Sequence, residues 1–145
     1  MSKIKTFRGL IPTGGQDTIH LSTSDGTIGY RIKRFELIGN KPGIDNHESV
    51  VKIYKTEQTT VDAVIDFSDS TLLASGYLEG SSSVLYIDAL IVSFDQEIFN
   101  QDIFVTHKDA LAGSPSVNYV IDLEQIKLDS NETAVATLKN IKNRS

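Results

Sequence analysis

Two carboxylates near the end of the chain have a spacing that acid–base chemistry uses. Asp122 and Glu124 alternate with apolar residues, so on a strand over 117–128 they share one face, about 7 Å apart. A carboxylate pair at that separation suits glycoside hydrolysis. Any solvent-facing strand gives the same pattern, and the chain has no tryptophan to stack on a sugar ring. We therefore favour a solvated strand face over a glycosidase site.

Two acidic clusters contain the hard oxygen ligands that Ca²⁺ prefers. They consist of Asp62, Asp66 and Asp69, and of Asp95, Glu97 and Asp102. Neither follows the order of an EF-hand loop, and acidic side chains also keep strand edges from associating. One alternative function stays open, a carbohydrate- or calcium-binding β-sandwich module in which these loops and Tyr77, Tyr86 or Tyr119 surround a shallow site.

The other residue types that support catalysis lack the necessary context. The histidines His20, His47 and His107 show no metal-ligand spacing, and the absence of cysteine excludes disulfides, thiolate catalysis and cysteine-based zinc sites. The Gly113-Ser114-Pro115-Ser116 segment is a turn and does not match a nucleophile elbow. We predict no catalytic residue, no metal site and no cofactor, and hence a protein that is not an enzyme.

Arg31, Lys33 and Arg34 form the tightest basic cluster, next to Tyr30 and Phe35. Sheet-based readers of nucleic acid stack bases on such aromatics. The alternative that we favour places both aromatics in the core and the cations in water. The net charge of −5 also argues against nucleic acid as the main partner.

The charges are unevenly distributed along the chain. Residues 1–60 have a balance of +3, residues 61–132 of −11 and residues 133–145 of +3. If these stretches map to different faces, the surface is two-sided and suits head-to-tail association. An uneven distribution of charge is also common in β-proteins.

Short runs with a period of two, separated by turn residues, predict a mostly β chain of one domain. The slip of the apolar phase between Ile32 and Phe35 predicts a β-bulge or a strand that changes sheets. Asp25-Gly26 predicts a hairpin turn between its flanking strands. The expected strands cover residues 4–11, 18–22, 28–38, 50–54, 61–67, 71–78, 84–94, 103–107 and 117–128.

The pattern changes after residue 128. Asp129 and Glu132 form a capping box, and apolar residues then recur at helical spacing, which predicts a helix over 130–142. Its apolar stripe must dock on its own β domain or on a neighbouring subunit. The expected fold is an antiparallel, jelly-roll-like β-sandwich over 1–128, with the short C-terminal helix of 129–145 in the same domain.

Several short motifs occur in order along most of the chain. They are Phe7-Arg8-Gly9, Thr13-Gly14-Gly15, Asp25-Gly26 before Gly29-Tyr30-Arg31-Ile32, Asn100-Gln101-Asp102-Ile103, Val105-Thr106-His107, Asn118-Tyr119 before Glu124, and Leu138-Lys139-Asn140-Ile141. With these motifs the chain resembles small structural proteins of bacteriophages, especially marine phages. The resemblance implies a virion component, but no motif is catalytic and no functional residue is carried over.

The expected function is that of a non-enzymatic virion structural protein, a capsid, capsid-decorating or minor component. It would pack against copies of itself and other virion proteins through a few buried anchors or strand addition. We expect it in the virion, made in the host cytoplasm without a signal peptide and without a membrane partner. The residues expected at its interfaces are Ile4, Phe7, Arg31, Lys33, Arg34, Val135, Leu138 and Ile141.

Overall fold

Alternating apolar and polar residues form eight β-strands in the computed structural model. The structure describes residues 3–21, 27–42, 44, 46–80, 89–110 and 115–128, and no helix occurs among them. The strands are β1 (Lys3–Pro12), β2 (Gln16–Ile19), β3 (Ile28–Gly39), β4 (His47–Tyr54), β5 (Leu72–Gly80), β6 (Ala89–Phe94), β7 (Ile103–Asp109) and β8 (Ser116–Lys127). The C-terminal helix predicted over 130–142 lies outside the described residues.

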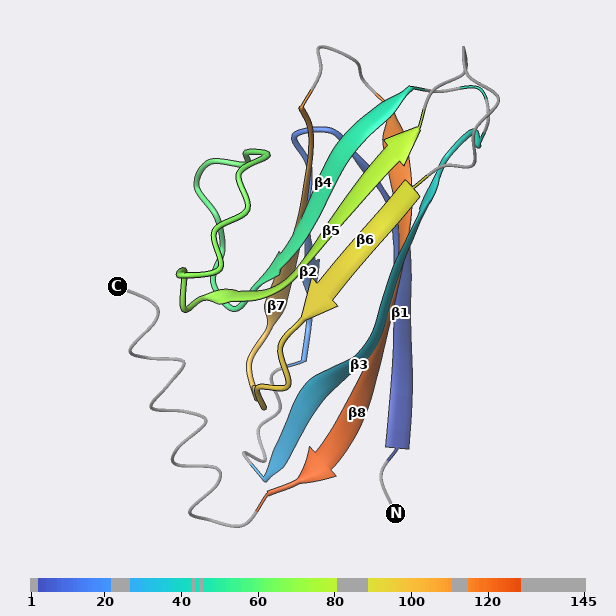
Figure 1. Cartoon of the computed structure of the whole chain (residues 1–145). Helices are drawn as coiled ribbons and strands as arrows, with labels where there is room; N and C mark the ends of the chain where they lie inside the picture. The colour runs from blue at the N-terminus through green and yellow to red at the C-terminus, as the bar shows by residue number, and fades with distance from the viewer. Residues whose placement is uncertain are drawn as a thin grey trace.

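The strands form two antiparallel sheets in a sandwich-like arrangement (Figure 1). One sheet has three strands in the order β1-β8-β3, and the other has five in the order β2-β7-β4-β5-β6. Every neighbouring pair is antiparallel. The predicted antiparallel, sandwich-like β fold is therefore confirmed at this level.

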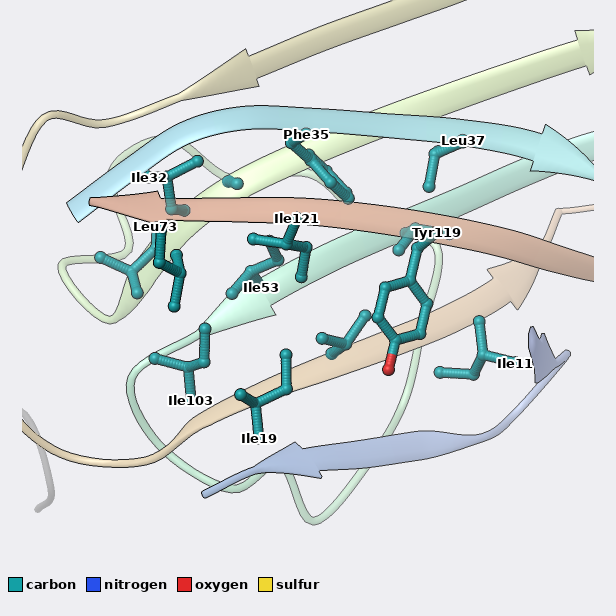
Figure 2. Close-up of a cluster of buried hydrophobic side chains, with 14 of the residues drawn as sticks. Ile11, Ile19, Ile32, Phe35, Leu37, Ile53, Leu73, Ile103, Tyr119 and Ile121 are labelled. Atoms are coloured by element: carbon teal, nitrogen blue, oxygen red, sulfur yellow. The ribbon is translucent and has the colours of Figure 1, made fainter. Parts of the chain in front are cut away.

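One apolar core lies between the two sheets (Figure 2). In β8, Ile121 and Leu123 have no exposed surface, and the same holds for Ile53 of β4 and Ile103 of β7. Burying one such side chain contributes about 1.5–3 kcal/mol. The core thus fixes which face of β8 points inward, because a shift of one residue would expose its whole apolar set.

A β-bulge interrupts β3, as the slip in its apolar phase predicts. The register against β8 shifts between Ile32 and Arg34, which leaves Lys33 without a partner residue. Ile32 and Phe35 both point into the core as a result, although three positions separate them. Arg31 and Arg34 consequently share the opposite face.

The segment between β6 and β7 touches the other sheet on its way. Phe99 pairs with Tyr30 at the outer edge of β3, where each backbone amide donates to the other residue's carbonyl, at 2.7 and 2.9 Å. Their rings stack with centroids 6.5 Å apart. The chain that leaves the edge of the five-stranded sheet therefore touches the edge of the three-stranded one.

Two local predictions are wrong. Residues 61–67 form no strand, although their apolar residues alternate, because this segment crosses the outer surface of the five-stranded sheet as a loop. The hairpin predicted at Asp25-Gly26 does not form between the flanking strands, since β2 pairs with β7 and β3 pairs with β8. Around Asp25-Gly26 the local signal is outweighed by pairing of the flanking strands with residues far away in the sequence.

Candidate interaction face

The outward surface of the three-stranded sheet gathers the basic cluster and the carboxylate pair that the sequence singles out. The strand register arranges twelve side chains in four rows across β1, β8 and β3. We call this surface the ladder face. Its rows are Ile4, Glu124 and Arg31; Thr6, Asp122 and Arg34; Arg8, Val120 and Glu36; and Leu10, Asn118 and Ile38.

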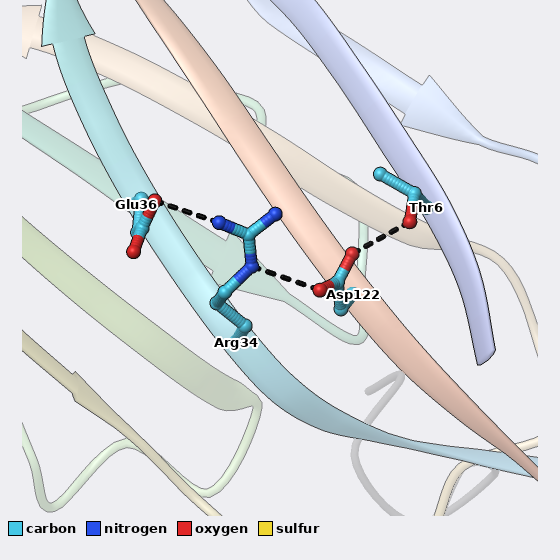
Figure 3. Close-up of polar contacts among 4 residues, drawn as sticks. All are labelled: Thr6, Arg34, Glu36 and Asp122. Atoms are coloured by element: carbon cyan, nitrogen blue, oxygen red, sulfur yellow. Dashed lines mark hydrogen bonds and ion pairs between the residues drawn. The ribbon is translucent and has the colours of Figure 1, made fainter.

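Arg34 and Asp122 form the centre of a hydrogen-bonded network on the ladder face (Figure 3). Arg34 donates from Nε to Asp122 Oδ2 at 2.8 Å and from a terminal guanidinium nitrogen to Glu36 Oε2 at 2.8 Å. Thr6 donates to the other oxygen of Asp122 at 2.7 Å. The hydrogen bond from Thr6, followed by that from Arg34, lowers the pKa of Asp122, so this carboxylate is held ionised.

The second carboxylate of the pair has its own arginine. Arg31 donates from Nε to Glu124 Oε1 at 2.6 Å, and the Glu124 side chain is only 13% exposed. Both carboxylates predicted to share a face do so, but each is paired across the sheet with a cation. Two carboxylates that are each paired with an arginine fit a structural role better than a general acid and base, which need pKa values that are driven apart.

Exposed apolar side chains surround the charged rows. Ile4 and Leu10 of β1 are each 49% exposed, and Ile38 of β3 is 59% exposed. All three lie on the outer strands of this sheet. Among the described residues, β1 pairs only with β8, and the far edge of β3 pairs only at Tyr30, so both edges retain unpaired backbone groups.

The other residues predicted at interfaces lie elsewhere. Phe7 is half-buried and packs against the core on the inner side of β1, while Lys33 is exposed in the bulge. Tyr30 and Phe35 are 2% and 3% exposed, so the favoured placement of these aromatics in the core is confirmed. Three further residues, Val135, Leu138 and Ile141, fall outside the described part of the chain.

The acidic clusters are used for local structure. Asp66 accepts from the backbone and hydroxyl of Ser68, and Asp69 does the same for Thr71. Asp62 and Glu97 are bound to Lys52 and Lys55. Within the described ranges, no three histidine or acidic side chains are placed to hold a metal ion.

The tyrosines of the alternative binding module are not gathered at one surface. Tyr119 is 5% exposed and donates to Asp17 across the core at 2.8 Å, whereas Tyr77 donates to Glu48 on the outer surface of the five-stranded sheet. Tyr86 is outside the described residues. Tyr77 and Tyr119 therefore do not line the same surface, as the expected shallow site requires.

A buried polar cluster at the end of the sandwich was not predicted from the sequence. Ser49 donates to Asp109 Oδ2 at 3.1 Å and lies 3.0 Å from His47 Nδ1, and His107 Nδ1 lies 2.9 Å from the Ile11 carbonyl. Burial lowers the pKa of His107. The cluster depends on the pairing of Ser49 with Asp109 across β4 and β7, and no local sequence pattern indicates this pairing.

This cluster does not reproduce a hydrolase triad. In a triad the histidine lies between the serine and the carboxylate, whereas here the hydroxyl of Ser49 lies between His47 and Asp109. Ser49 has no exposed surface, so the hydroxyl does not reach a substrate at the surface in this conformation. Among the described residues, the Nε2 atoms of His47 and His107 are buried without a hydrogen-bond partner.

No helix within the described ranges has the length and apolarity to cross a membrane. Comparison with protein-family models, with curated proteins and with solved structures finds no match to this chain.

Proposed function

We propose that this chain is a virion structural protein that packs against copies of itself or other virion proteins through the ladder face. The carrying observation is that Arg31 and Arg34 of this face pair with Glu124 and Asp122 while Ile4, Leu10 and Ile38 stay exposed. A partner can cover these two ion pairs without leaving one of their members as an unpaired buried charge, which would cost several kcal/mol. Apolar anchors beside satisfied polar groups are typical of the buried centre of an interface.

The strand pairing supports a jelly-roll origin for the sandwich. Rolling up a long hairpin pairs the first strand with the eighth, the second with the seventh, the third with the sixth and the fourth with the fifth. The chain has the β1–β8, β2–β7 and β4–β5 pairs, and at Phe99, five residues after β6 ends, the chain touches the edge of β3. Only β6 departs from this pairing scheme, because it pairs with β5 and not with β3. Jelly rolls form viral capsid and lectin domains, although a fold alone does not fix a function.

Native mass measured by light scattering tests the proposal, at several protein and salt concentrations. We expect a wild-type oligomer and at least a ~10-fold weaker association, about 1.4 kcal/mol, for Ile38→Asp, which would place a charge in the interface. The matched control is Ile44→Asp, since Ile44 is 67% exposed and lies outside the ladder face. Equal masses for the two variants would remove the ladder face from the proposal.

The virion role needs a separate measurement. Mass spectrometry of purified particles of the phage that encodes the chain should detect it at a fixed ratio to the major shell protein. A chain that is monomeric at every condition and absent from particles would overturn the proposal. Heat released on titration with Ca²⁺ or glycans would instead favour the binding-module alternative.

A further inference from the structure

The loop over residues 55–71 is fastened to the five-stranded sheet at two points. Lys52 of β4, whose side chain is 2% exposed, donates from Nζ to Asp62 Oδ1 at 2.7 Å and to the Val64 carbonyl at 2.6 Å. Gln58 in the loop and Gln16 of β2 exchange two hydrogen bonds of 2.9 Å. The loop therefore has a defined position, and it stands out from the body of the sandwich (Figure 1).

This loop presents apolar side chains to solvent. Val64 is 64% exposed, Ile65 38% and Phe67 73%. Phe67 also lines a half-open hollow of about 220 Å³ whose other walls are Leu72, Leu73, Ala74, Ser93, Phe94 and Asp95. We call these three side chains and the hollow the loop patch. Contiguous exposed apolar surface on a fixed loop marks an interaction site.

Carboxylates border the loop patch without a cationic partner among the described residues. Asp66 and Asp69 accept from Ser68 and Thr71, and Asp95 accepts from the Glu97 amide at 2.9 Å. The hydrogen bonds from Ser68 lower the pKa of Asp66, so it carries its charge. An apolar surface with an ionised acidic border fits an apolar partner segment that carries cations.

The last part of this chain has that chemistry. Residues 133–145 carry a balance of +3 from Lys139, Lys142 and Arg144. On the helix predicted over 130–142, Leu138 and Ile141 lie on one apolar stripe. Such a stripe would supply apolar side chains for the hollow, and the cations beside it would match the acidic border in charge.

The segment also starts close to the loop patch. A Cβ built on Gly29 would lie 2.8 Å from Ile98 and 3.0 Å from Leu128, so the end of the described chain is beside Ile98. Ile98 is three positions from Asp95, at most about 10 Å along the chain. A helix over 130–142 spans about 20 Å. The tether is thus long enough, and it gives the segment an effective concentration in the millimolar range at its own loop patch.

We propose that the C-terminal segment 129–145 docks on the loop patch of its own chain, with Leu138 and Ile141 against Phe67 and the hollow. This contact is separate from the proposed function, because it uses the loop 55–71 and the hollow beside β5 and β6 and leaves the ladder face free. The proposed contact places the segment on its own domain. The sequence alone allows a neighbouring subunit as the alternative.

Cysteine pairing in the full chain tests this docking, since the chain contains no cysteine of its own. The test variants are Phe67→Cys with Leu138→Cys, and Ile65→Cys with Ile141→Cys for the other helical register. The matched control is Leu10→Cys with Leu138→Cys, which places the partner thiol on the ladder face. Disulfide closure under mild oxidation is followed by intact mass and by mobility on non-reducing gels.

We expect at least one test pair to close within the monomer at least ~10-fold faster than the control pair, because docking raises the local thiol concentration. Closure between chains, or equal rates for test and control pairs, would overturn the proposal. The native mass of Leu138→Asp with Ile141→Asp separates the two hypotheses. Assembly should persist in this variant if the ladder face is the interface, whether or not the segment docks.

Discussion

Replacing Asp62 by asparagine tests whether one buried cation fastens the loop 55–71. Burial acts to lower the pKa of Lys52, but the hydrogen bond and charge of Asp62, together with Tyr54, outweigh burial and raise it. Lys52 therefore stays charged inside the fold, and Asp62 is its only carboxylate partner among the described ion pairs. Asp62→Asn keeps the shape and an acceptor oxygen but removes the negative charge.

The expected cost follows from the geometry. Removing one partner of a fully buried pair costs about 3–5 kcal/mol. Asp62 is half-exposed and the Val64 carbonyl remains as a second acceptor, so we expect about 1–2 kcal/mol for Asp62→Asn. Lys52→Met removes the buried charge itself and fills similar volume, so it should stay within about 1 kcal/mol of the wild type. The double variant should match Lys52→Met.

Urea unfolding of the four proteins at neutral pH, with thermal melts beside it, gives the coupling free energy. For a chain of this size 1 kcal/mol corresponds to about 4 °C, so Asp62→Asn should lower Tm by about 4–8 °C. The pKa of Asp62 is lowered from 3.8, so this stabilisation is present above pH 3.8 and is lost as the pH falls through the folded-state pKa. If Lys52→Met destabilises the fold more than Asp62→Asn does, the reasoning is wrong.

Two further predictions concern the core. Burial lowers the pKa of His107 from 6.5, so its contribution to stability is full above pH 6.5 and declines as the pH falls below it. Urea unfolding at pH 7.5 and 5 should show a loss of stability that is smaller in His107→Gln, and an equal loss in both proteins would show that His107 is not its source. Gly76→Ala should lower the free energy of unfolding by about 1–3 kcal/mol, because the added Cβ would lie 2.7 Å from Leu37 and 3.3 Å from Phe35. An unchanged Tm would show that the Leu37 side chain moves aside freely.

Sequence patterns predicted what depends on neighbouring residues and missed what depends on distant ones. The bulge in β3 was predictable, because Ile32 and Phe35 must both reach the core. The loop 55–71 was not, since its alternation also fits a strand and only contact with Lys52 identifies the loop. The His47, Ser49 and Asp109 cluster depends on the register of β4 against β7, which follows from the whole sheet.

The uneven distribution of charge along the chain brings opposite charges together within the fold. Among the described residues, four ion pairs join a lysine or arginine from residues 1–60 to a carboxylate from residues 61–132, namely Arg31–Glu124, Arg34–Asp122, Lys52–Asp62 and Lys55–Glu97. The acidic β8 lies between β1 and β3, so its charges are balanced within one sheet. Opposite charges far apart in the sequence thus meet within the molecule. The docking proposed for residues 129–145 extends this rule, because it would bring Lys139, Lys142 and Arg144 toward the carboxylates that border the loop patch, Asp66, Asp69 and Asp95.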